Sequence, residues 1–380
     1  MKSKKIFIVL QYKKAYHYYE VSLMKIKSKL KDYEVFLEED FAFVNDLVHL
    51  DNSFYVVSKT VYTLYHPLFS EIEADCLYVM SSTEENKTIN TALSICEKIT
   101  NLPAKRNAKL VSFGGGVIQD ITGFVANIMY RGIDWIFVPT TLLSACDSCI
   151  GGKTSLNYNK YKNLLGTFYS PNEIHIWSGF FQTLSEGDFK SGLGELIKFG
   201  FMSGLTGFYE INSNITSLLE KDLATIDKFV EKSLLYKKAF IEADEFDRGE
   251  RLKLNYAHTF GHAIEVISNY KVPHGTAVAI GMIMANRISY KRGYITEHII
   301  KQSERLLMNI IDVDISLLEK PLDLYISAIK KDKKQVDDTI TAVLITKFED
   351  DSDLAIVHDV NYKEVEEAIQ YAIELYRVSA

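Results

Sequence analysis

The chain has 380 residues, a length that predicts two or three domains of roughly 150 residues each. Its composition, 47% hydrophobic and 24% charged, excludes wholesale disorder, a collagen-like chain and a coiled coil. The formal net charge of -7 argues against general electrostatic binding to nucleic acid or to an anionic membrane, and leaves room for a local basic pocket that holds one small anion.

The N-terminal segment has the basic start of a signal peptide, but its apolar part is too short. The uninterrupted apolar stretch covers only residues 6–10, so the segment predicts a first β-strand. No run of the sequence approaches the ~20 apolar residues of a membrane span. Because no export signal is found, we expect a reducing cytoplasm and no disulfide framework among Cys76, Cys96, Cys146 and Cys149.

The first half of the chain alternates short β-rich runs with helical patterns. Runs rich in Val, Ile, Phe and Tyr predict strands over residues 5–11, 53–58, 76–80, 109–115 and 135–141. Helical patterns lie between several of them, including residues 87–99 and 118–129. This repeated order predicts an α/β domain over residues 1–183, with a parallel, Rossmann-like sheet covered by helices.

The pattern changes to mostly helical from residue 184 onward. Helices are predicted over residues 224–242, 259–267, 277–292 and 365–376, with residues 341–346 as the one convincing late strand. We therefore expect a mostly α-helical domain over residues 184–380. No Pro-rich or Gly/Ser-rich linker separates the two halves, so we expect them to pack tightly, with the functional site between them.

A glycine triplet, residues 114–116, stands where a predicted strand ends and a predicted helix begins. Glycines allow a ligand to approach the backbone closely, and the N-terminus of a helix offers unpaired N–H groups to a phosphate. The triplet therefore favours pyrophosphate binding, although it differs from the GxGxxG fingerprint. A simple tight turn is the alternative interpretation.

Two histidines, His258 and His262, are four residues apart and so share one helix face. His274 follows downstream, and Glu195 and Lys198 share a helix face upstream. One carboxylate and two imidazoles form a common ligand set for a catalytic zinc ion that keeps a position open for substrate. The pair lacks the glutamate of HExxH, which excludes the metalloprotease reading. The alternative is a set of core histidines satisfied by hydrogen bonds.

The segment from Asp147 to Thr154 combines an acidic residue with a lysine behind two glycines. Lys153 suits an anion or phosphate, and Asp147 could hold a hydroxyl. A P-loop would need a glycine at position 147, so that reading fails. Further along, Lys237, Arg251 and Asn255 belong to a charged stretch that precedes the first histidine. Such a stretch is usually a solvated face, but its position suggests that some members point into the site.

Taken together, these segments resemble the 3-dehydroquinate synthase family of sugar phosphate cyclases. The resemblance runs in consistent order over residues 84–334, through GGGVIQDITGFVA, IGGKTSLN, KNLLGTFYSP, GLGELIKFG, NYAHTFGHAIE and HGTAVAIGM. It implies an NAD-binding domain, a helical domain with a zinc ion that cobalt could replace, and a homodimer. It also implies a lyase of the shikimate pathway, which eliminates phosphate from a seven-carbon sugar acid phosphate and closes a carbocycle while NAD is regenerated.

The resemblance also implies roles for individual residues. The implied zinc ligands are Glu195, His258 and His274. The implied substrate phosphate contacts are Lys153, Asn163, Asn255, His262 and one of Lys333 or Lys334, with Arg131 reaching from the partner subunit. Lys198 and Asp147 match positions at the oxidised hydroxyl and the nicotinamide, and Lys237 and Arg251 match positions that bind the substrate carboxylate. The implied dinucleotide contacts are Glu84, Lys87, Gly115, Gly116, Asp120, Thr140, Thr141, Lys162, Phe180 and Thr183.

The sequence departs from the family pattern at several positions, which puts the substrate in doubt more than the mechanism. Examples are Gln119 for a glycine, Thr276 for a glutamate and Ala257 for the glycine before the first histidine. One alternative is a sibling cyclase that uses an amino-sugar acid phosphate or a neutral sedoheptulose phosphate. Others are a metal-dependent polyol dehydrogenase and a catalytically dead regulator.

Overall fold

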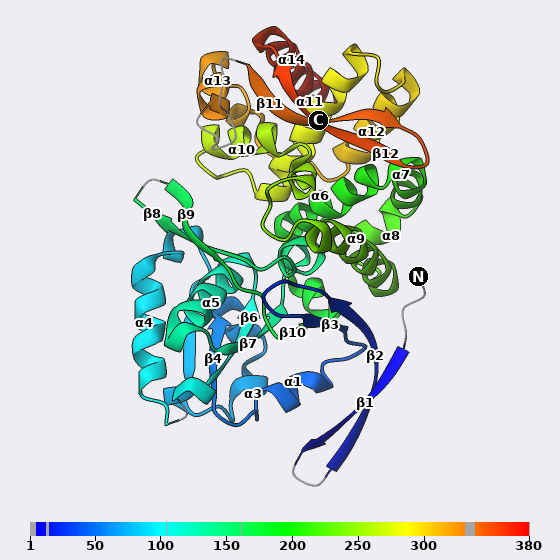
Figure 1. Ribbon diagram of the computed structural model, residues 1–380. Helices are drawn as coiled ribbons and strands as arrows, with labels where there is room; N and C mark the ends of the chain where they lie inside the picture. The colour runs from blue at the N-terminus through cyan, green and yellow to red at the C-terminus, as the bar shows by residue number, and fades with distance from the viewer. Residues whose placement is uncertain (1–4, 13–14, 104, 160, 331–338, 380) are drawn as a thin grey trace. The chain divides into compact units, whose positions relative to one another are not determined.

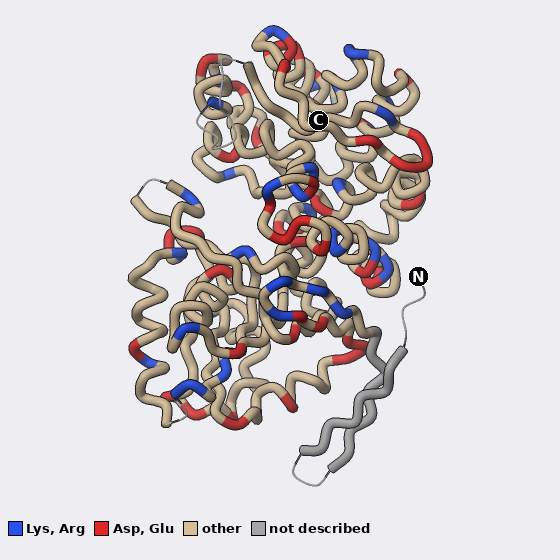
Figure 2. Tube along the Cα trace, in the orientation of Figure 1, with Lys and Arg blue, Asp and Glu red and all other residues tan. Residues whose placement is uncertain are grey.

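The structure is a computed structural model that describes residues 5–12, 15–103, 105–159, 161–330 and 339–379 (Figure 1). The chain divides into two compact units, unit 1 over Met1–Leu184 and unit 2 over Ser185–Ala380. Basic and acidic residues occur along the trace of both units (Figure 2). Within the described ranges, none of the helices combines the length and the apolar character needed to cross a membrane.

Unit 1 is built on one eight-stranded sheet with the order β1-β2-β3-β10-β7-β6-β4-β5. Neighbouring strands are parallel from β3 to β5, which confirms the predicted parallel sheet there. At the other edge β1 and β2 pair antiparallel, as do β2 and β3, so the sheet as a whole is mostly parallel. The strands are β1 (Lys5–Tyr12), β2 (Ala15–Ile26), β3 (Tyr33–Leu37), β4 (Ser53–Ser58), β5 (Leu77–Met80), β6 (Lys109–Gly114), β7 (Asp134–Pro139) and β10 (Glu173–Ile176).

The central strands are apolar because both faces of the sheet are covered. Every residue of β4 is buried, and so are all residues of β6 and β7 after the first. In parallel sheets the carboxyl ends of the strands form one edge, where ligands bind. In unit 1 this edge carries the glycine triplet after β6 and Thr140 and Thr141 after β7.

Helices and a second hairpin complete unit 1. α5 packs against β4, β6 and β7, and the hairpin of β8 and β9 packs on α4 and α5 (Figure 1). The sequence analysis predicted neither strand of this hairpin, because residues 153–168 are polar and partly exposed. The elements are α1 (Ala42–Leu47), α2 (Lys59–Leu64), α3 (His66–Phe69), α4 (Ile89–Thr100), α5 (Gly116–Ile128), β8 (Lys153–Tyr158) and β9 (Tyr161–Phe168).

Unit 2 is mostly helical, as predicted, and α11 lies at its centre. α11 is buried on nearly all sides and contacts α6, α10, α12, α14 and β11. The helices are α6 (Glu186–Met202), α7 (Gly204–Ser213), α8 (Ile215–Leu219), α9 (Leu223–Ala243), α10 (His258–Ile267), α11 (His274–Lys291), α12 (Glu297–Met308), α13 (Leu322–Lys330) and α14 (Tyr362–Ser379).

The predicted late strand is confirmed as β11 (Ile340–Phe348), but it pairs with a strand that was not predicted, β12 (Ser352–Val360). β12 was missed because its sequence, SDLAIVHDV, mixes polar and apolar residues along a partly exposed edge. A second difference is the start of α11, which begins at His274, three residues before the predicted start. This shift places His274 in the first turn of the helix.

Candidate active site

Three side chains from three helices of unit 2 form a group that could hold a metal ion. They are Glu195 of α6, His258 of α10 and His274 of α11, and their ligand atoms all lie within 4.8 Å of one another. The Nε2 atoms of His258 and His274 lie 3.6 Å and 3.4 Å from Oε1 of Glu195. The resemblance implied this same set as the zinc ligands.

Glycines bring these helices close enough for the group to form. A Cβ atom on Gly194 would lie 2.2 Å from the carbonyl oxygen of Gly275, so α6 and α11 touch through their backbones. On the other side of α11, a Cβ atom on Gly281 would lie 2.4 Å from the carbonyl oxygen of Ala257. Contacts this close exclude any side chain larger than hydrogen. Gly194 and Gly275 are the chain neighbours of Glu195 and His274, so the backbone contact fixes the distance between these two side chains.

Each imidazole of the group is held at its Nδ1 atom by a second interaction. Nδ1 of His258 lies 3.0 Å from the carbonyl oxygen of Tyr256, and Nδ1 of His274 lies 3.2 Å from Oε2 of Glu265. Because a carbonyl oxygen can only accept, the neutral His258 ring carries its proton on Nδ1 and turns the lone pair of Nε2 toward Glu195. Such outer hydrogen bonds orient histidine ligands in metal sites.

The charges around Glu195 favour a cation between its carboxylate and the imidazoles. Both carboxylate oxygens are buried, and neither accepts a hydrogen bond of conventional geometry from the described residues. Oε2 forms an ion pair with Nζ of Lys198 at 2.5 Å. Oε1 faces the lone pair of His258, and two acceptors at that distance repel each other unless a proton or metal ion lies between them. The donor set and its geometry therefore fit a divalent metal ion.

The pKa values of the three groups follow from the same arrangement. Burial raises the pKa of the Glu195 carboxyl, but Lys198 and His274 outweigh it and keep the group ionised. Burial, together with Lys198 and the neighbouring imidazoles, lowers the pKa of His258 well below its usual value, so its ring is neutral. Burial also lowers the pKa of His274, but Glu265 and Glu195 outweigh it and raise the pKa to about 10. In a metal-loaded site the cation takes the place of that proton.

His262 lies beside this group without belonging to it. Its ring centroid is 5.4 Å from that of His258 and 6.0 Å from that of His274. Its own potential ligand group consists of His262, Glu265 and His274, whose ligand atoms also lie within 4.8 Å of one another. His258, His262 and Glu265 follow one another at spacings of four and three residues, so they share the face of α10.

The other predicted substrate contacts of unit 2 are buried cations and an amide. Lys237 of α9 is 7% exposed and Arg251 of η7 (Glu250–Asn255) is 3% exposed. α9 and η7 pack against each other. Nη1 of Arg251 donates to the carbonyl oxygen of Glu245, and the side chain of Asn255 donates to the carbonyl oxygen of Leu252 at 2.9 Å. Lys334 and Lys333 lie outside the described residues.

In unit 1, several predicted dinucleotide contacts meet where β6 and β7 end. Gly115 caps α5, and a Cβ atom there would lie 2.9 Å from Cγ2 of Thr141. Gly116 begins the helix, and Thr140 donates its backbone N–H to the carbonyl oxygen of Gly114 at 2.9 Å. The glycine triplet therefore lies beside Thr140 and Thr141, next to the N-terminus of α5.

Asp147 lies in a π-helical turn, η5 (Ser144–Ser148), that follows this edge. Single π-helical turns are frequent at functional sites. Gln119 holds the turn: its Nε2 donates to the carbonyl oxygen of Ser148 at 2.6 Å and its Oε1 accepts from the Ser148 hydroxyl at 2.7 Å. The departure from the family pattern at Gln119 thus has a structural role, the attachment of this turn to α5.

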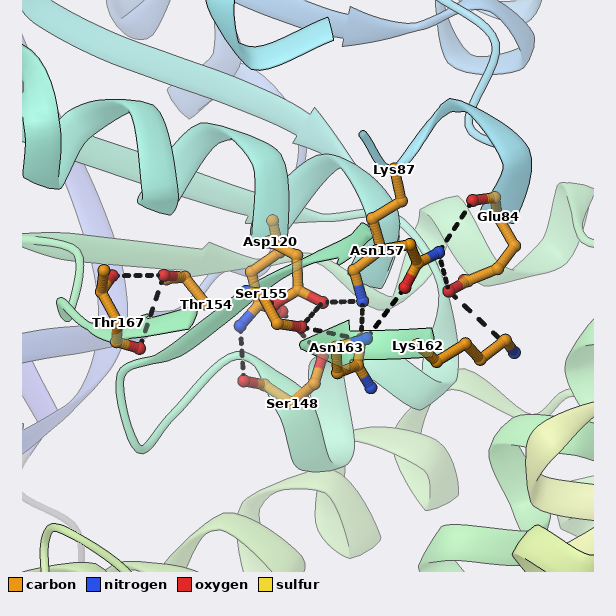
Figure 3. Close-up of polar contacts among 11 residues, drawn as sticks. Glu84, Lys87, Asp120, Ser148, Thr154, Ser155, Asn157, Lys162, Asn163 and Thr167 are labelled. Carbon is orange, nitrogen blue, oxygen red and sulfur yellow. Dashed lines mark hydrogen bonds and ion pairs between the residues drawn. The ribbon is translucent and has the colours of Figure 1, made fainter. Parts of the chain in front are cut away.

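A polar network brings together five further predicted residues (Figure 3). Nζ of Lys87 forms an ion pair with Asp120 of α5 and donates to Oδ1 of Asn163 at 2.6 Å. Lys162 lies 4.0 Å from Oε1 of Glu84. Burial raises the pKa of the Asp120 carboxyl, although the Lys87 ammonium acts in the opposite direction.

The remaining predicted residues of unit 1 are Phe180, Thr183, Lys153 and Arg131. Phe180 packs edge-on against Tyr65 and Trp177, and Thr183 hydrogen-bonds the Tyr65 hydroxyl at 3.2 Å. Lys153 begins β8 and is exposed. Arg131 is exposed at the end of a turn in which Tyr130, Arg131 and Gly132 all have positive φ angles, of 51°, 69° and 115°. Two consecutive non-glycine residues in this region mark backbone strain, which often occurs at functional sites.

Comparison with known proteins identifies the family. Residues 77–191 match the family model described as 3-dehydroquinate synthase N-terminal, and residues 192–335 match the one described as 3-dehydroquinate synthase C-terminal. The chain belongs to the 3-dehydroquinate synthase family. It is 36% identical over 330 residues to 3-dehydroquinate synthase of Dictyoglomus turgidum, covering 84% of this chain and 91% of that protein. The family predicted from the sequence motifs is thereby confirmed.

Solved structures agree with the fold of a 3-dehydroquinate synthase family member. One is 2-deoxy-scyllo-inosose synthase in complex with carbaglucose-6-phosphate, NAD+ and Co2+, with a TM-score of 0.80 and 22% identity over 92% of this chain and 99% of that chain. Another is 2-epi-5-epi-valiolone synthase from Streptomyces hygroscopicus with NAD+ and Zn2+ bound, with a TM-score of 0.77 and 24% identity over the same shares. At these identities the likeness shows the fold.

Sequence reasoning missed several residues that the structure places against the predicted ones. Glu265 contacts His274, and Ser155 and Asn157 contact Asp120, Glu84 and Asn163. The spacing of Glu265 from His262 and His258 could have revealed it, because all three share a helix face. No comparable signal existed for Ser155 and Asn157, since their partners depend on an unpredicted hairpin.

Proposed function

We propose that this family member is a 3-dehydroquinate synthase. It converts a seven-carbon 3-deoxy sugar acid phosphate to 3-dehydroquinate and releases phosphate. The observation that carries the proposal is the group formed by Glu195, His258 and His274. In this group two imidazoles face a buried carboxylate in an arrangement that fits a divalent metal ion. The 36% identity to a curated 3-dehydroquinate synthase supports this choice over a polyol dehydrogenase.

Zinc is the proposed metal, held by Glu195, His258 and His274. Three protein ligands leave a position for substrate, and a bound divalent ion supplies Lewis acidity toward a substrate hydroxyl. Glu265 and the carbonyl oxygen of Tyr256 hold the two imidazoles in the orientation that presents Nε2. Lys198, paired with Glu195, places a buried ammonium beside this hydroxyl, where it favours the deprotonated oxygen.

NAD is the proposed cofactor of unit 1, where it supplies a temporary oxidation of the substrate alcohol. The glycine triplet at the N-terminus of α5 offers backbone N–H groups to the pyrophosphate. The polar network offers further contacts, the ammonium groups of Lys87 and Lys162 among them. The proposed dinucleotide contacts are Glu84, Lys87, Gly115, Gly116, Asp120, Thr140, Thr141, Lys162, Phe180 and Thr183, and Asp147 is assigned to the nicotinamide end.

Buried cations of unit 2 favour a substrate that carries a carboxylate. A guanidinium binds both oxygens of a carboxylate, and a buried cation gains most from an anionic partner. Arg251 and Lys237 are buried and lie on elements that pack together. These residues therefore favour the sugar acid phosphate over a neutral sedoheptulose phosphate, and they leave an amino-sugar acid phosphate as the second candidate.

The substrate phosphate is assigned to Lys153, Asn163, Asn255, His262 and Lys334. An imidazole beside a leaving phosphate can hold or transfer a proton near neutral pH, which is the role proposed for His262. Arg131 is assigned to the same phosphate from the partner subunit of a homodimer. The turn that carries Arg131 is exposed and has a strained backbone, and such strain is often found at functional sites, which supports this assignment.

A substrate comparison tests this proposal. The zinc-loaded protein is incubated with NAD+ and, in parallel, with the sugar acid phosphate, its amino analogue or sedoheptulose 7-phosphate, and phosphate release is followed. We expect release from the sugar acid phosphate and identification of the carbocycle 3-dehydroquinate by mass and NMR spectra. Faster release from the amino analogue would assign the protein to the sibling cyclase, and release from none would contradict a cyclase function.

A further inference from the structure

The hairpin of β8 and β9 contains an irregularity next to two proposed ligand contacts. The register pairs Leu156 with Leu165 and Tyr158 with Tyr161, so the single residue Asn157 lies opposite residues 162–164. Within this bulge Asn163 has a φ angle of 53°, in the left-handed region that asparagine tolerates better than most residues. Bulges of this kind redirect side chains and are common beside active sites. Here the redirected residues include Lys162 and Asn163.

The side chain of Asn157 takes the place of the missing ladder hydrogen bonds. Its Oδ1 accepts from the backbone N–H of Asn163 at 2.9 Å. Its Nδ2 donates to the backbone carbonyl and to Oε1 of Glu84, at 3.1 Å and 2.8 Å (Figure 3). Only an amide offers an acceptor and two donors on one short side chain, so Asn157 can join the bulge and the Glu84 segment at once.

The backbone of Asn157 strengthens the same attachment. Its N–H donates to the carbonyl oxygen of Lys87 at 2.8 Å, and Asn157 forms a parallel bridge with Thr88. The hairpin is therefore attached at Asn157 to the segment that leads into α4. Glu84 and Lys87, two proposed dinucleotide contacts, lie in that segment.

Ser155, two residues earlier, orients the amide of Asn163 from the other side. Its hydroxyl lies 2.9 Å from Oδ1 of Asn163 and 3.2 Å from Oδ2 of Asp120, and its backbone N–H donates to Oδ1 of Asp120 at 3.1 Å. Lys87 also donates to Oδ1 of Asn163. Ser155 and Lys87 thus both contact the amide oxygen of Asn163, which fixes the orientation of its side chain.

We propose that Asn157 is a positioning residue of the ligand site: it holds the β9 bulge so that Lys162 and Asn163 present their donors to a dinucleotide or a substrate phosphate. This inference rests on the proposed function, which assigns those two residues to the ligands. Asn157 itself acts through them. Loss of its side chain therefore weakens ligand binding more than it slows turnover at saturation.

The test compares NAD+ binding and hydrogen exchange in the zinc-loaded wild type and variants. In Asn157→Ala we expect the Kd for NAD+, measured by calorimetry, to rise about ten-fold or more, since two to three hydrogen bonds are lost. The KM values for NAD+ and for the sugar acid phosphate rise with it, while kcat at saturation changes by less than about three-fold. The backbone amide of Asn163 exchanges faster, which reports the bulge without reference to function. Asn157→Asp keeps the acceptor for that amide, so it retains the protection of Asn163 while losing the donors to Glu84.

A matched control lies in the same hairpin. The hydroxyl groups of Thr167 and Thr154 lie 2.6 Å apart, outside the network (Figure 3). Thr167→Val therefore removes a polar pair of the β8–β9 hairpin and should leave NAD+ affinity within about two-fold of wild type.

If Asn157→Ala does not fold, Ser155→Ala replaces it, with a smaller rise in Kd expected from the loss of one hydroxyl. A wild type that binds no NAD+ contradicts the proposed function. A wild type that binds NAD+ with an unchanged Kd in the Asn157 or Ser155 variant, or an equal loss in Thr167→Val, overturns the positioning role.

Discussion

Gly194 and Gly275 touch through their backbones, so that a Cβ atom on Gly194 would lie 2.2 Å from the carbonyl oxygen of Gly275. The contact is reinforced by the backbone N–H of Gly275, which donates to the Ser191 hydroxyl at 3.0 Å. Glu195 follows Gly194 in the chain, and His274 precedes Gly275. The packing of α6 against α11 therefore also sets the distance between these two proposed metal ligands. A change in the packing should therefore be visible as a change in metal affinity.

Gly275→Ala tests this connection. The added Cβ atom would lie 1.7 Å from the carbonyl oxygen of Ser191, which forces α6 and α11 apart. We expect the free energy of unfolding, measured in urea, to fall by about 1–3 kcal/mol or more, which is the usual cost of overpacking a core. We expect the zinc affinity, measured by competition with a chelator, to fall as well. The control is Gly187→Ala, also on α6, where no atom lies within 4 Å of the new Cβ. Equal zinc affinity in wild type and Gly275→Ala would contradict the connection.

Glu265→Ala removes the carboxylate that holds Nδ1 of His274. Outer-shell partners of metal-bound histidines typically contribute about 10–100-fold to metal affinity, so we expect the zinc Kd to rise by that order. Glu265→Gln keeps an oxygen acceptor and should lose less. The control Glu297→Gln removes the charge of a surface carboxylate on α12 that pairs with Lys301, and should leave the zinc Kd unchanged. If Glu265→Ala binds zinc as tightly as wild type, Glu265 does not orient the ligand.

His262→Ala separates a substrate role from a metal role. Three ligands already surround the proposed metal position, and a fourth would close the site to substrate. We expect the variant to retain a full complement of zinc and its unfolding transition while kcat falls by about 10²–10⁴-fold, the range typical of lost acid–base catalysis. Metal content measured by emission spectrometry decides the matter. Loss of zinc in this variant would make His262 a ligand, through its group with Glu265 and His274.

His175 predicts a stability change at alkaline pH in unit 1. Its ring lies between Phe36 and Phe43, with centroid distances of 4.7 Å and 5.5 Å, and its two nitrogens contact Glu38 at 2.7 Å and Glu173 at 3.2 Å. Burial lowers the pKa of His175, but the two carboxylates outweigh burial and raise it to about 9 from an ordinary value of 6.5.

A raised pKa in the folded state stabilises the fold only while the proton is bound. The contribution is complete below pH 6.5, declines between pH 6.5 and pH 9, and is lost above it. Its full size corresponds to about 3 kcal/mol. We expect urea unfolding of wild type, compared with the double variant Glu38→Gln/His175→Gln, to show a difference that shrinks from pH 6 to pH 10. A difference that is constant or grows over this range would show that His175 is not protonated in the folded state.

The metal group was predictable from the sequence because its signals are local. The spacing of His258 and His262 indicates one helix face, and the family motifs supply Glu195 and His274. The position of the glycine triplet at the carboxyl edge of the sheet was predictable for a local reason, since the triplet follows an apolar strand and marks the end of β6. In both cases short motifs carried the information, although Glu195 lies far from the two histidines in the sequence.

The network around Asn157 was not predictable, because its partners are far apart in the sequence. Glu84, Asp120 and Asn163 come together only through the β8–β9 hairpin, whose strands carry polar, partly exposed residues without clean alternation. Strand β12 was missed for a related reason, since pairing in a partly exposed two-stranded sheet places weak demands on the sequence. Strand β2, which pairs with both β1 and β3, was not predicted either. The close backbone contact of Gly194 and Gly275 is likewise a property of two helices, and neither helix alone indicates it.

The number of phosphate ions released per NAD+ supplied tests the central claim most directly. The zinc-loaded protein is given limiting NAD+ and an excess of the seven-carbon sugar acid phosphate, and phosphate release is followed together with absorbance of the reduced nicotinamide. Because the proposed oxidation is temporary, we predict many phosphate ions per NAD+ with no net growth of that absorbance. Two results would contradict the account. One is accumulation of NADH in proportion to the substrate consumed, and the other is phosphate release that continues in metal-free protein without NAD+.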